Sequence, residues 1–197
     1  MGHRTNGEPV LDIFLIRHTR VQVAEGTCYG QTDVRLSDTF DAEFAAIQAK
    51  LPVFSQPVQV ISSPLSRCLQ LAARLSYKIK TDPRIMELHF GDWEMKSWED
   101  LTNKQISQWA EDYIHSAPPN GESYQALYDR CTAFWTELVA QELEQVVIVT
   151  HTGVIRALVA HVLELPLHKS FSLHFDYGAV SHLVFHRDWT RVVYLNR

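Results

Sequence analysis

The stretch LDIFLIRHT, residues 11–19, carries the strongest indication of the fold. Its first six residues are mostly large apolar side chains, which is typical of a short strand buried on both faces of a parallel sheet. The apolar run stops at Arg17 and His18. In open α/β sheets, ligands bind beyond the carboxyl ends of such strands, so this stretch predicts both a central strand and a candidate site.

Two further apolar runs, Val58–Ile61 and Val146–Val149, predict two more buried parallel strands. Helical periodicity follows in three segments, which are Leu65–Leu75, Tyr124–Leu138 and Gly153–Val162. Alternating strands and helices predict an α/β domain, here a three-layer α/β/α arrangement with a mostly parallel central sheet.

The end of the chain has a different pattern. Ser181–His186 and Val192–Leu195 cluster strand-forming residues around Arg187 and Asp188, which predicts a hairpin at the sheet edge. Residues 86–119 are rich in Trp, Asp and Glu, and we expect an irregular or helical insertion over the sheet. Without an internal repeat or low-complexity linker, residues 1–197 are expected to form a single domain.

Composition narrows the function classes. The 197 residues are 46% hydrophobic and carry a net charge of −5, which predicts a globular domain and argues against a basic surface for nucleic acid. Cys28, Cys68 and Cys131 lack the paired spacing of a zinc or redox site, so a reduced chain is expected. We find no signal-peptide pattern and no apolar run long enough for a membrane span, and we expect a cytoplasmic protein.

Polar residues with a shared chemistry follow each predicted parallel strand. Arg17 and His18 follow the first, Arg67 lies just beyond the second, and His151 follows the third. A guanidinium binds phosphate oxygens in a bidentate manner, and an imidazole can attack phosphorus or donate a hydrogen bond to it. The set predicts phosphoryl chemistry.

Such chemistry also needs a proton donor for the leaving oxygen. The acidic stretch 87–94, ELHFGDWE, is the candidate source, with Glu87 preferred and Asp92 and Glu94 as substitutes. Singly, each residue has an ordinary alternative: a histidine in the core, a solvated helix arginine, a surface carboxylate. Their convergence at strand ends favours the functional interpretation.

At this point the sequence resembles the histidine phosphatase superfamily, which has the phosphoglycerate mutase-like fold. The resemblance covers nearly the whole chain and rests on five motifs in order: LIRHT at 15–19, SSPLSR at 62–67, ELHFGDWE at 87–94, PNGES at 119–123 and VTHTGVIR at 149–156. Within the family, GTCYGQTD at 26–33 is similar to the bacterial alpha-ribazole phosphatases of cobalamin assembly.

The resemblance implies a role for each site residue. His18 is the nucleophile that becomes a phosphohistidine, Arg17 and Arg67 neutralise the phosphoryl oxygens, His151 stabilises the transition state and Glu87 is the general acid and base. The implied substrate-binding residues are Arg17, Thr19, Gln31, Thr32, Arg67, His151 and Thr152. No metal or other cofactor is expected, because the arginines supply the positive charge.

The chain departs from the usual family pattern at two positions. Thr19 stands where most members have Gly, and Ala24 stands where many carry a phosphate-contacting Asn. That contact is either missing or supplied by Gln31 or Thr32, of which we favour Thr32. The compact chain lacks the insertions of the glycolytic mutases, which favours a phosphatase.

The expected substrate is a small phosphate ester, with alpha-ribazole 5′-phosphate preferred. Tyr29, Phe90, Trp93 and Trp98 could stack a flat base; for Phe90 and Trp93 a core role is equally compatible, and for Trp98 a core or surface role is favoured. The alternatives are a phosphoglycerate mutase or broad sugar-phosphate phosphatase, a non-catalytic phosphate-binding scaffold, and a metal-binding histidine cluster. A monomer and a homodimer are both compatible with the sequence.

Overall fold

The predicted first strand is β1 (Leu11–Arg17), which lies inside a six-stranded sheet of order β3-β2-β4-β1-β5-β6. The computed structural model describes residues 10–54, 56–76, 78–101 and 103–197. β1 pairs in parallel with β4 (Gln145–Thr150), which pairs in parallel with β2 (Gln59–Ser62). The prediction of three buried parallel strands is therefore confirmed.

The sheet edges differ in how well the sequence predicted them. β3 (Ile79–Thr81) pairs in parallel with β2 and was not predicted, because its three residues are too few for a pattern. β5 (Val180–His186) runs antiparallel to β1 and pairs with β6 (Trp189–Tyr194). This is the predicted hairpin at the edge, although its second strand begins at Trp189 rather than Val192.

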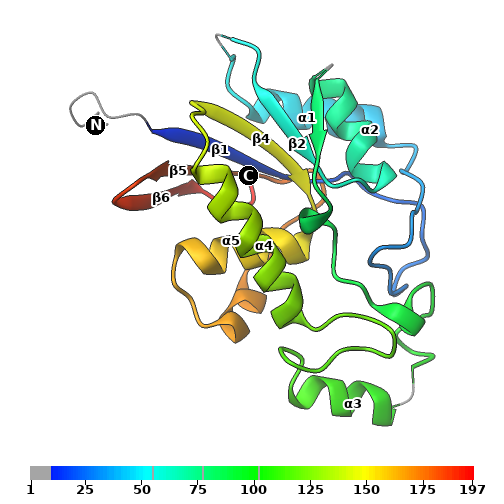
Figure 1. Cartoon of the computed structure of the whole chain (residues 1–197). Helices are drawn as coiled ribbons and strands as arrows, with labels where there is room; N and C mark the ends of the chain where they lie inside the picture. Colours follow the sequence, from blue (N-terminus) through cyan, green and yellow to red (C-terminus); the bar gives the residue numbers. More distant parts are fainter. Residues whose placement is uncertain (1–9, 55, 77, 102) are drawn as a thin grey trace.

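Helices cover both faces of the sheet (Figure 1). On one face, α4 (Tyr124–Val139) and α5 (Thr152–Val162) pack on a core that includes Ile13 and Leu15 of β1. On the other face, α1 (Phe40–Lys50) and α2 (Ser66–Leu75) pack on Phe14 and Ile16. Successive β1 side chains thus enter opposite cores, which explains the unbroken apolar run and confirms the three-layer prediction.

α1 was missed in the sequence because its apolar face is narrow: only Phe44 and Ile47 are buried. The short 3₁₀ segments Pro83–Ile85, Gly91–Trp93 and Leu167–Ser172 were also unforeseen. No helix in the described part of the chain has both the length and the apolar character that a membrane span requires.

Residues 86–119 contain α3 (Asn103–Glu111), which lies beyond the end of the sheet in Figure 1. This corrects the expectation that the insertion lies over the sheet. The reason is a small separate core, in which Cys28, Trp93 and Leu101 are buried together with Trp98 and Trp109 packed against them. An isolated bridge between Thr27 and Ser97 further ties the insertion to the segment after β1.

Candidate active site

The strand ends bring the predicted site residues together. Arg17, the last residue of β1, lies opposite Thr150, the last residue of β4, and the amide of Ser63 donates to the carbonyl of Val149. His18 and His151 therefore emerge side by side, with ring centroids 5.2 Å apart. Arg67 enters the same region from the first turn of α2.

A hollow of about 340 Å³ opens at this edge, which we call the arginine pocket. Residues from several separate segments of the chain line it: Arg17, His18, Thr27, Cys28, Tyr29, Arg67, Glu87, Phe90, Trp98, Arg156 and Tyr177. Three guanidiniums, one imidazole and one carboxylate thus share a single cavity.

His18 is held in one tautomer. Its Nδ1 lies 2.7 Å from the carbonyl oxygen of Thr19, and a carbonyl only accepts, so Nδ1 carries the proton and Nε2 the lone pair. Burial lowers the pKa of His18 well below its ordinary value, and Arg67 and Arg17 lower it further. The ring is therefore neutral near pH 7, as a nitrogen nucleophile must be.

The two predicted phosphate-binding arginines are fixed by backbone carbonyls. Arg67 is fully buried and donates to the carbonyls of Thr32 and Gly30 at 2.9 and 2.5 Å. Arg17 donates to the carbonyl of Phe175 at 2.6 Å, and its guanidinium lies 3.7 Å from the ring centre of Tyr177. Neither arginine has a carboxylate partner in the described part of the chain, so both retain uncompensated positive charge.

Unsatisfied donors concentrate at the same place. Among the described residues, five buried side-chain polar atoms lack a hydrogen-bond partner, and four of them belong to predicted site residues: Arg17 Nε, Thr19 Oγ1, Arg67 Nε and Thr152 Oγ1. Buried polar groups are nearly always satisfied in folded proteins, so such a cluster calls for an explanation. An anion rich in acceptor oxygens would supply it.

His151 is the residue before the first turn of α5 and is fully buried. Its Nε2 lies 2.8 Å from Ser63 Oγ, and Cys68 Sγ lies 3.5 Å from the same nitrogen. Burial, followed by the charges of His18 and Arg67, lowers the pKa of His151 well below its ordinary value. Ser63 was present in a quoted motif without a predicted role; the structure places it as the partner of this imidazole.

The three candidate carboxylates occupy different environments. Glu87 lines the pocket, and its oxygens accept from the amides of Leu88 and Gly153 at 2.9 and 3.2 Å. Glu94 accepts from the amides of Gln31, Thr32 and Phe90 and from the Thr32 hydroxyl. Burial acts to raise the pKa of Glu94, but these hydrogen bonds outweigh it and hold the pKa below its ordinary value. Asp92 is exposed and accepts from Asn120.

A half-buried ion pair positions the segment that carries Glu87. Arg130 of α4 pairs with Glu122 at 2.5 Å and donates to the carbonyls of Arg84, Met86 and Glu87. This clamp gives a structural reason for the PNGES motif, since Glu122 belongs to it.

Gln31 and Thr32 lie beside the pocket but do not line it. Gln31 donates its side-chain amide to the carbonyl of Glu87 at 3.0 Å. The amide and hydroxyl of Thr32 both donate to Glu94, so in this conformation neither is available to a phosphate group. Ala24 is exposed and contributes no polar side chain.

The aromatic residues considered for stacking a base differ in whether they line the pocket. Trp93 is 3% exposed and belongs to the small core with Cys28. Phe90 and Trp98 line the pocket and contact each other edge to face, with ring centroids 5.6 Å apart. Trp98 packs against the small core, as expected, and also lines the pocket, because the loop that includes Lys96 pairs with Cys28 and carries Trp98 to the pocket.

Four pocket residues, Thr27, Cys28, Arg156 and Tyr177, were not singled out as site residues from the sequence. Arg156 lies within the quoted VTHTGVIR motif, where its spacing from His151 was the available signal. Tyr177 lies in a segment with no recognisable pattern, and its hydroxyl lies 2.5 Å from that of Tyr29.

The described residues contain no group of three or more His, Cys, Asp or Glu side chains suited to a metal ion. His182 pairs with Asp12 at 2.6 Å.

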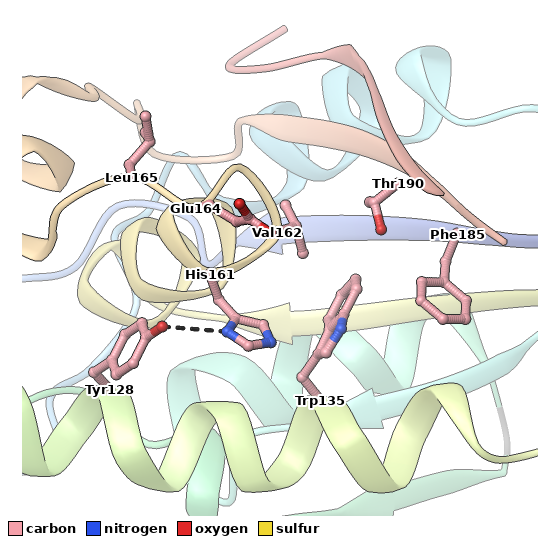
Figure 2. Close-up of a pocket in the computed structure, with 8 residues that line it drawn as sticks. All are labelled: Tyr128, Trp135, His161, Val162, Glu164, Leu165, Phe185 and Thr190. Atoms are coloured by element: carbon pink, nitrogen blue, oxygen red, sulfur yellow. Dashed lines mark hydrogen bonds between the residues drawn. The ribbon is translucent and has the colours of Figure 1, made fainter. Parts of the chain in front are cut away.

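A second hollow, of about 500 Å³, lies at the far end of α5 (Figure 2). We call it the distal hollow; it is lined by Tyr128, Trp135, His161, Val162, Glu164, Leu165, Phe185 and Thr190. The imidazole of His161 lies between the rings of Tyr128 and Trp135, and its Nδ1 is 3.2 Å from the Tyr128 hydroxyl.

Comparison with known proteins identifies the class. The sequence model of the histidine phosphatase superfamily (branch 1) matches residues 13–197. An adenosylcobalamin/alpha-ribazole phosphatase of Escherichia coli is 30% identical over 146 residues, which cover 70% of this chain and 71% of that protein.

Solved structures agree with the sequence comparison. An alpha-ribazole phosphatase from Shigella flexneri superimposes with a TM-score of 0.86 at 28% identity, covering 94% of this chain and 96% of the other. A mycobacterial glucosyl-3-phosphoglycerate phosphatase superimposes with a TM-score of 0.82 at 27% identity, covering 95% and 99%.

The chain therefore belongs to the histidine phosphatase superfamily. It is a phosphomonoesterase of that family, and a small phosphate ester is its substrate class.

Proposed function

We propose that the protein is a metal-independent phosphomonoesterase that works through a phosphohistidine on His18, with alpha-ribazole 5′-phosphate as its substrate. His18 lines the arginine pocket and its Nε2 carries the lone pair, so Nε2 is the atom that attacks phosphorus. The bond between phosphorus and the ester oxygen breaks as the bond from nitrogen to phosphorus forms.

Glu87 donates a proton in the first half-reaction and accepts one in the second. As a carboxylic acid it donates a proton to the leaving ester oxygen, so that the alcohol departs neutral. As a carboxylate it then takes a proton from the water that attacks the phosphohistidine, and the bond from nitrogen to phosphorus breaks to release phosphate. Glu94 is unsuited to this exchange, because four donors hold it as the anion.

Charge stabilisation comes from groups already in place. Arg17 and Arg67 are fixed by backbone carbonyls, so they need little reorganisation when negative charge develops on the phosphoryl oxygens. His151 adds a hydrogen bond from the start of α5, oriented by Ser63.

The cluster of unsatisfied polar atoms is the observation that carries this proposal. Two arginine Nε atoms and two threonine hydroxyls remain without partners around a neutral nucleophile. A phosphoryl group presents three oxygens that such donors can bind, whereas a scaffold without chemistry would not need a neutral imidazole beside them.

The substrate proposal rests on the other wall of the pocket. Tyr29, Phe90 and Trp98 present aromatic surface suited to a flat base such as the benzimidazole of alpha-ribazole. The alpha-ribazole phosphatases among the relatives favour the same substrate, which would place the protein in cobalamin assembly. We also expect it to act in the cytoplasm.

The test is phosphate release by purified protein, with chelator present, from alpha-ribazole 5′-phosphate, sugar phosphates, nucleotides, glucosyl-3-phosphoglycerate and phosphoglycerates. We expect the highest kcat/KM for alpha-ribazole 5′-phosphate and no release by His18→Ala. A different preferred ester would refute the substrate alone. Phosphate transfer to a second substrate without net release would indicate a mutase, and loss of activity with chelator would refute the metal-independent mechanism.

A further inference from the structure

Arg156 is a third guanidinium in the arginine pocket with no role in the mechanism above. It lies four residues after Thr152 on α5, so both residues face the same side of the helix, one turn apart. Its Nε donates to the carbonyl of Leu173 at 2.9 Å, and its guanidinium lies 5.3 Å from the ring centre of Phe171. These contacts orient the guanidinium toward the cavity that it lines.

The terminal nitrogens of Arg156 are available to a ligand. Within the described residues, the side chain makes one hydrogen bond, through Nε, and no ion pair with a carboxylate. Arg156 lines the pocket, so these terminal nitrogens can reach a ligand there. A fixed fork with two free ends is preorganised to bind oxygen atoms.

The phosphoryl group does not account for this third charge. Arg17 and Arg67 already offer two positive charges to a phosphate dianion. With Glu87 in the protonated form that the first half-reaction needs, Arg156 leaves the occupied pocket one positive charge in excess. A further acceptor on the substrate would compensate for it.

We propose that Arg156 is a specificity-determining residue that binds an oxygen acceptor on the alcohol part of the substrate. This inference rests on the proposed function, since it takes the phosphoryl group to lie at His18, Arg17 and Arg67. The substrate class is a phosphate ester whose alcohol carries a second oxygen close to the ester, either a sugar hydroxyl or a carboxylate. A site built to hydrogen-bond such an oxygen discriminates against esters that lack it.

The experiment compares three esters in R156K and R156Q. Ribose 5-phosphate offers hydroxyls, 3-phosphoglycerate offers a carboxylate besides one hydroxyl, and phenyl phosphate offers no further oxygen. In R156Q we expect kcat/KM to fall about 10- to 100-fold for an ester with the matching oxygen, mainly through KM, and to stay within about twofold for phenyl phosphate. R156K should recover part of the loss, because it keeps the charge but not the fork.

The pattern of losses identifies the acceptor. A larger loss for ribose 5-phosphate indicates a hydroxyl, and a larger loss for 3-phosphoglycerate indicates a carboxylate. Equal loss for all three esters, or no loss for any, would overturn the proposal. Arg74→Gln is the matched control, since Arg74 lies outside the pocket and pairs with Asp41 on the surface.

Binding measurements separate this inference from the mechanism. Calorimetry on His18→Ala, with and without R156Q, measures the affinity of each ester without turnover. We expect R156Q to weaken ribose 5-phosphate or 3-phosphoglycerate but to leave inorganic phosphate within about twofold. Weakened inorganic phosphate would mean that Arg156 binds the phosphoryl group and would overturn the proposal. A wild-type protein that binds the esters but releases no phosphate would contradict the proposed function alone.

Discussion

The arginine pocket and the distal hollow each contain a partly or fully buried histidine, yet their surroundings differ. Burial lowers the pKa of His18 and also of His161, so both imidazoles favour the neutral form. Arginines surround His18, whereas the eight residues that line the distal hollow include no arginine or lysine. His161 has a hydroxyl partner in Tyr128, whereas four of the five unsatisfied buried polar atoms among the described residues belong to the predicted site residues. A neutral buried histidine is therefore not sufficient evidence of catalysis; the uncompensated charge around it is what distinguishes the site.

The sharpest test of this comparison replaces each of the two histidines in turn. His18→Ala removes the proposed nucleophile and should lower kcat by about 10⁴-fold or more. His161→Phe keeps a ring in the distal hollow and should leave kcat within about twofold. The measurement is phosphate release from the preferred ester, with rapid-quench trapping of a labelled phosphoenzyme in the wild type. Equal losses in the two variants would erase the functional distinction between the hollows.

The next effect concerns the carboxylates. Glu87→Gln removes the proposed proton donor and should lower kcat by about 10²- to 10⁴-fold for an alkyl phosphate. The loss should be smaller for p-nitrophenyl phosphate, whose leaving group needs less protonation. Asp92→Asn is the control, because Asp92 is exposed and its carboxylate accepts only from Asn120 in the described structure. If Asp92→Asn showed the larger loss, the assignment of the acid would be wrong.

A substitution at Gly153 tests whether the position of the Glu87 carboxylate matters for catalysis. A Cβ at this position would lie 2.3 Å from Glu87 Oε1, so Gly153→Ala must displace the carboxylate. We expect kcat to fall about 100-fold, since misplacement by about 1 Å has that order of effect. Adding Gly153→Ala to a Glu87→Ala variant should cause almost no further loss. Additive losses in the double variant would show that the glycine acts through something other than Glu87.

A smaller expected effect concerns why the pKa values of His18 and His161 are lowered. Arg67 contributes to the low pKa of His18, after burial, whereas His161 has burial alone as its cause. Arg67→Met should therefore raise the pKa of His18 and leave that of His161 unchanged, as measured by NMR titration of the two imidazoles. If both values moved together, the variant would have altered burial rather than local charge.

These lowered values also set the sign of a pH effect on stability. Because each histidine resists protonation when folded, its contribution to the unfolding free energy is fully present above about pH 6.5 and declines as the pH falls below it. Unfolding in denaturant between pH 7 and pH 5 measures the decline. His161→Phe should make it shallower, and a decline as steep as in the wild type would contradict the burial effect.

The sequence predicted the centre of the site better than its walls. Arg17, His18 and His151 lie at or just after the ends of strands buried on both faces, and such strands have a clear apolar pattern that fixes where their ends meet. Trp98 and Tyr177 reach the pocket through loops, where long-range pairings such as that of Thr27 with Ser97 decide the path. Those pairings leave no periodic signal in the sequence. Arg156 lies between these cases, because its helix was predicted but its Leu173 contact was not.

The smallest predicted effect returns to the distal hollow. His161→Phe loses the hydrogen bond with Tyr128, which should lower the free energy of unfolding by about 1 kcal/mol at pH 7. The edge-to-face contact with Trp135, at a centroid distance of 6.5 Å, can be kept by the new ring. Tyr128→Phe removes the same hydrogen bond from the other side, so the double variant should cost little more than either single change. Chemical denaturation measures all three variants; a loss of several kcal/mol with unchanged activity would show that the distal hollow supports the fold far more strongly than its one hydrogen bond implies.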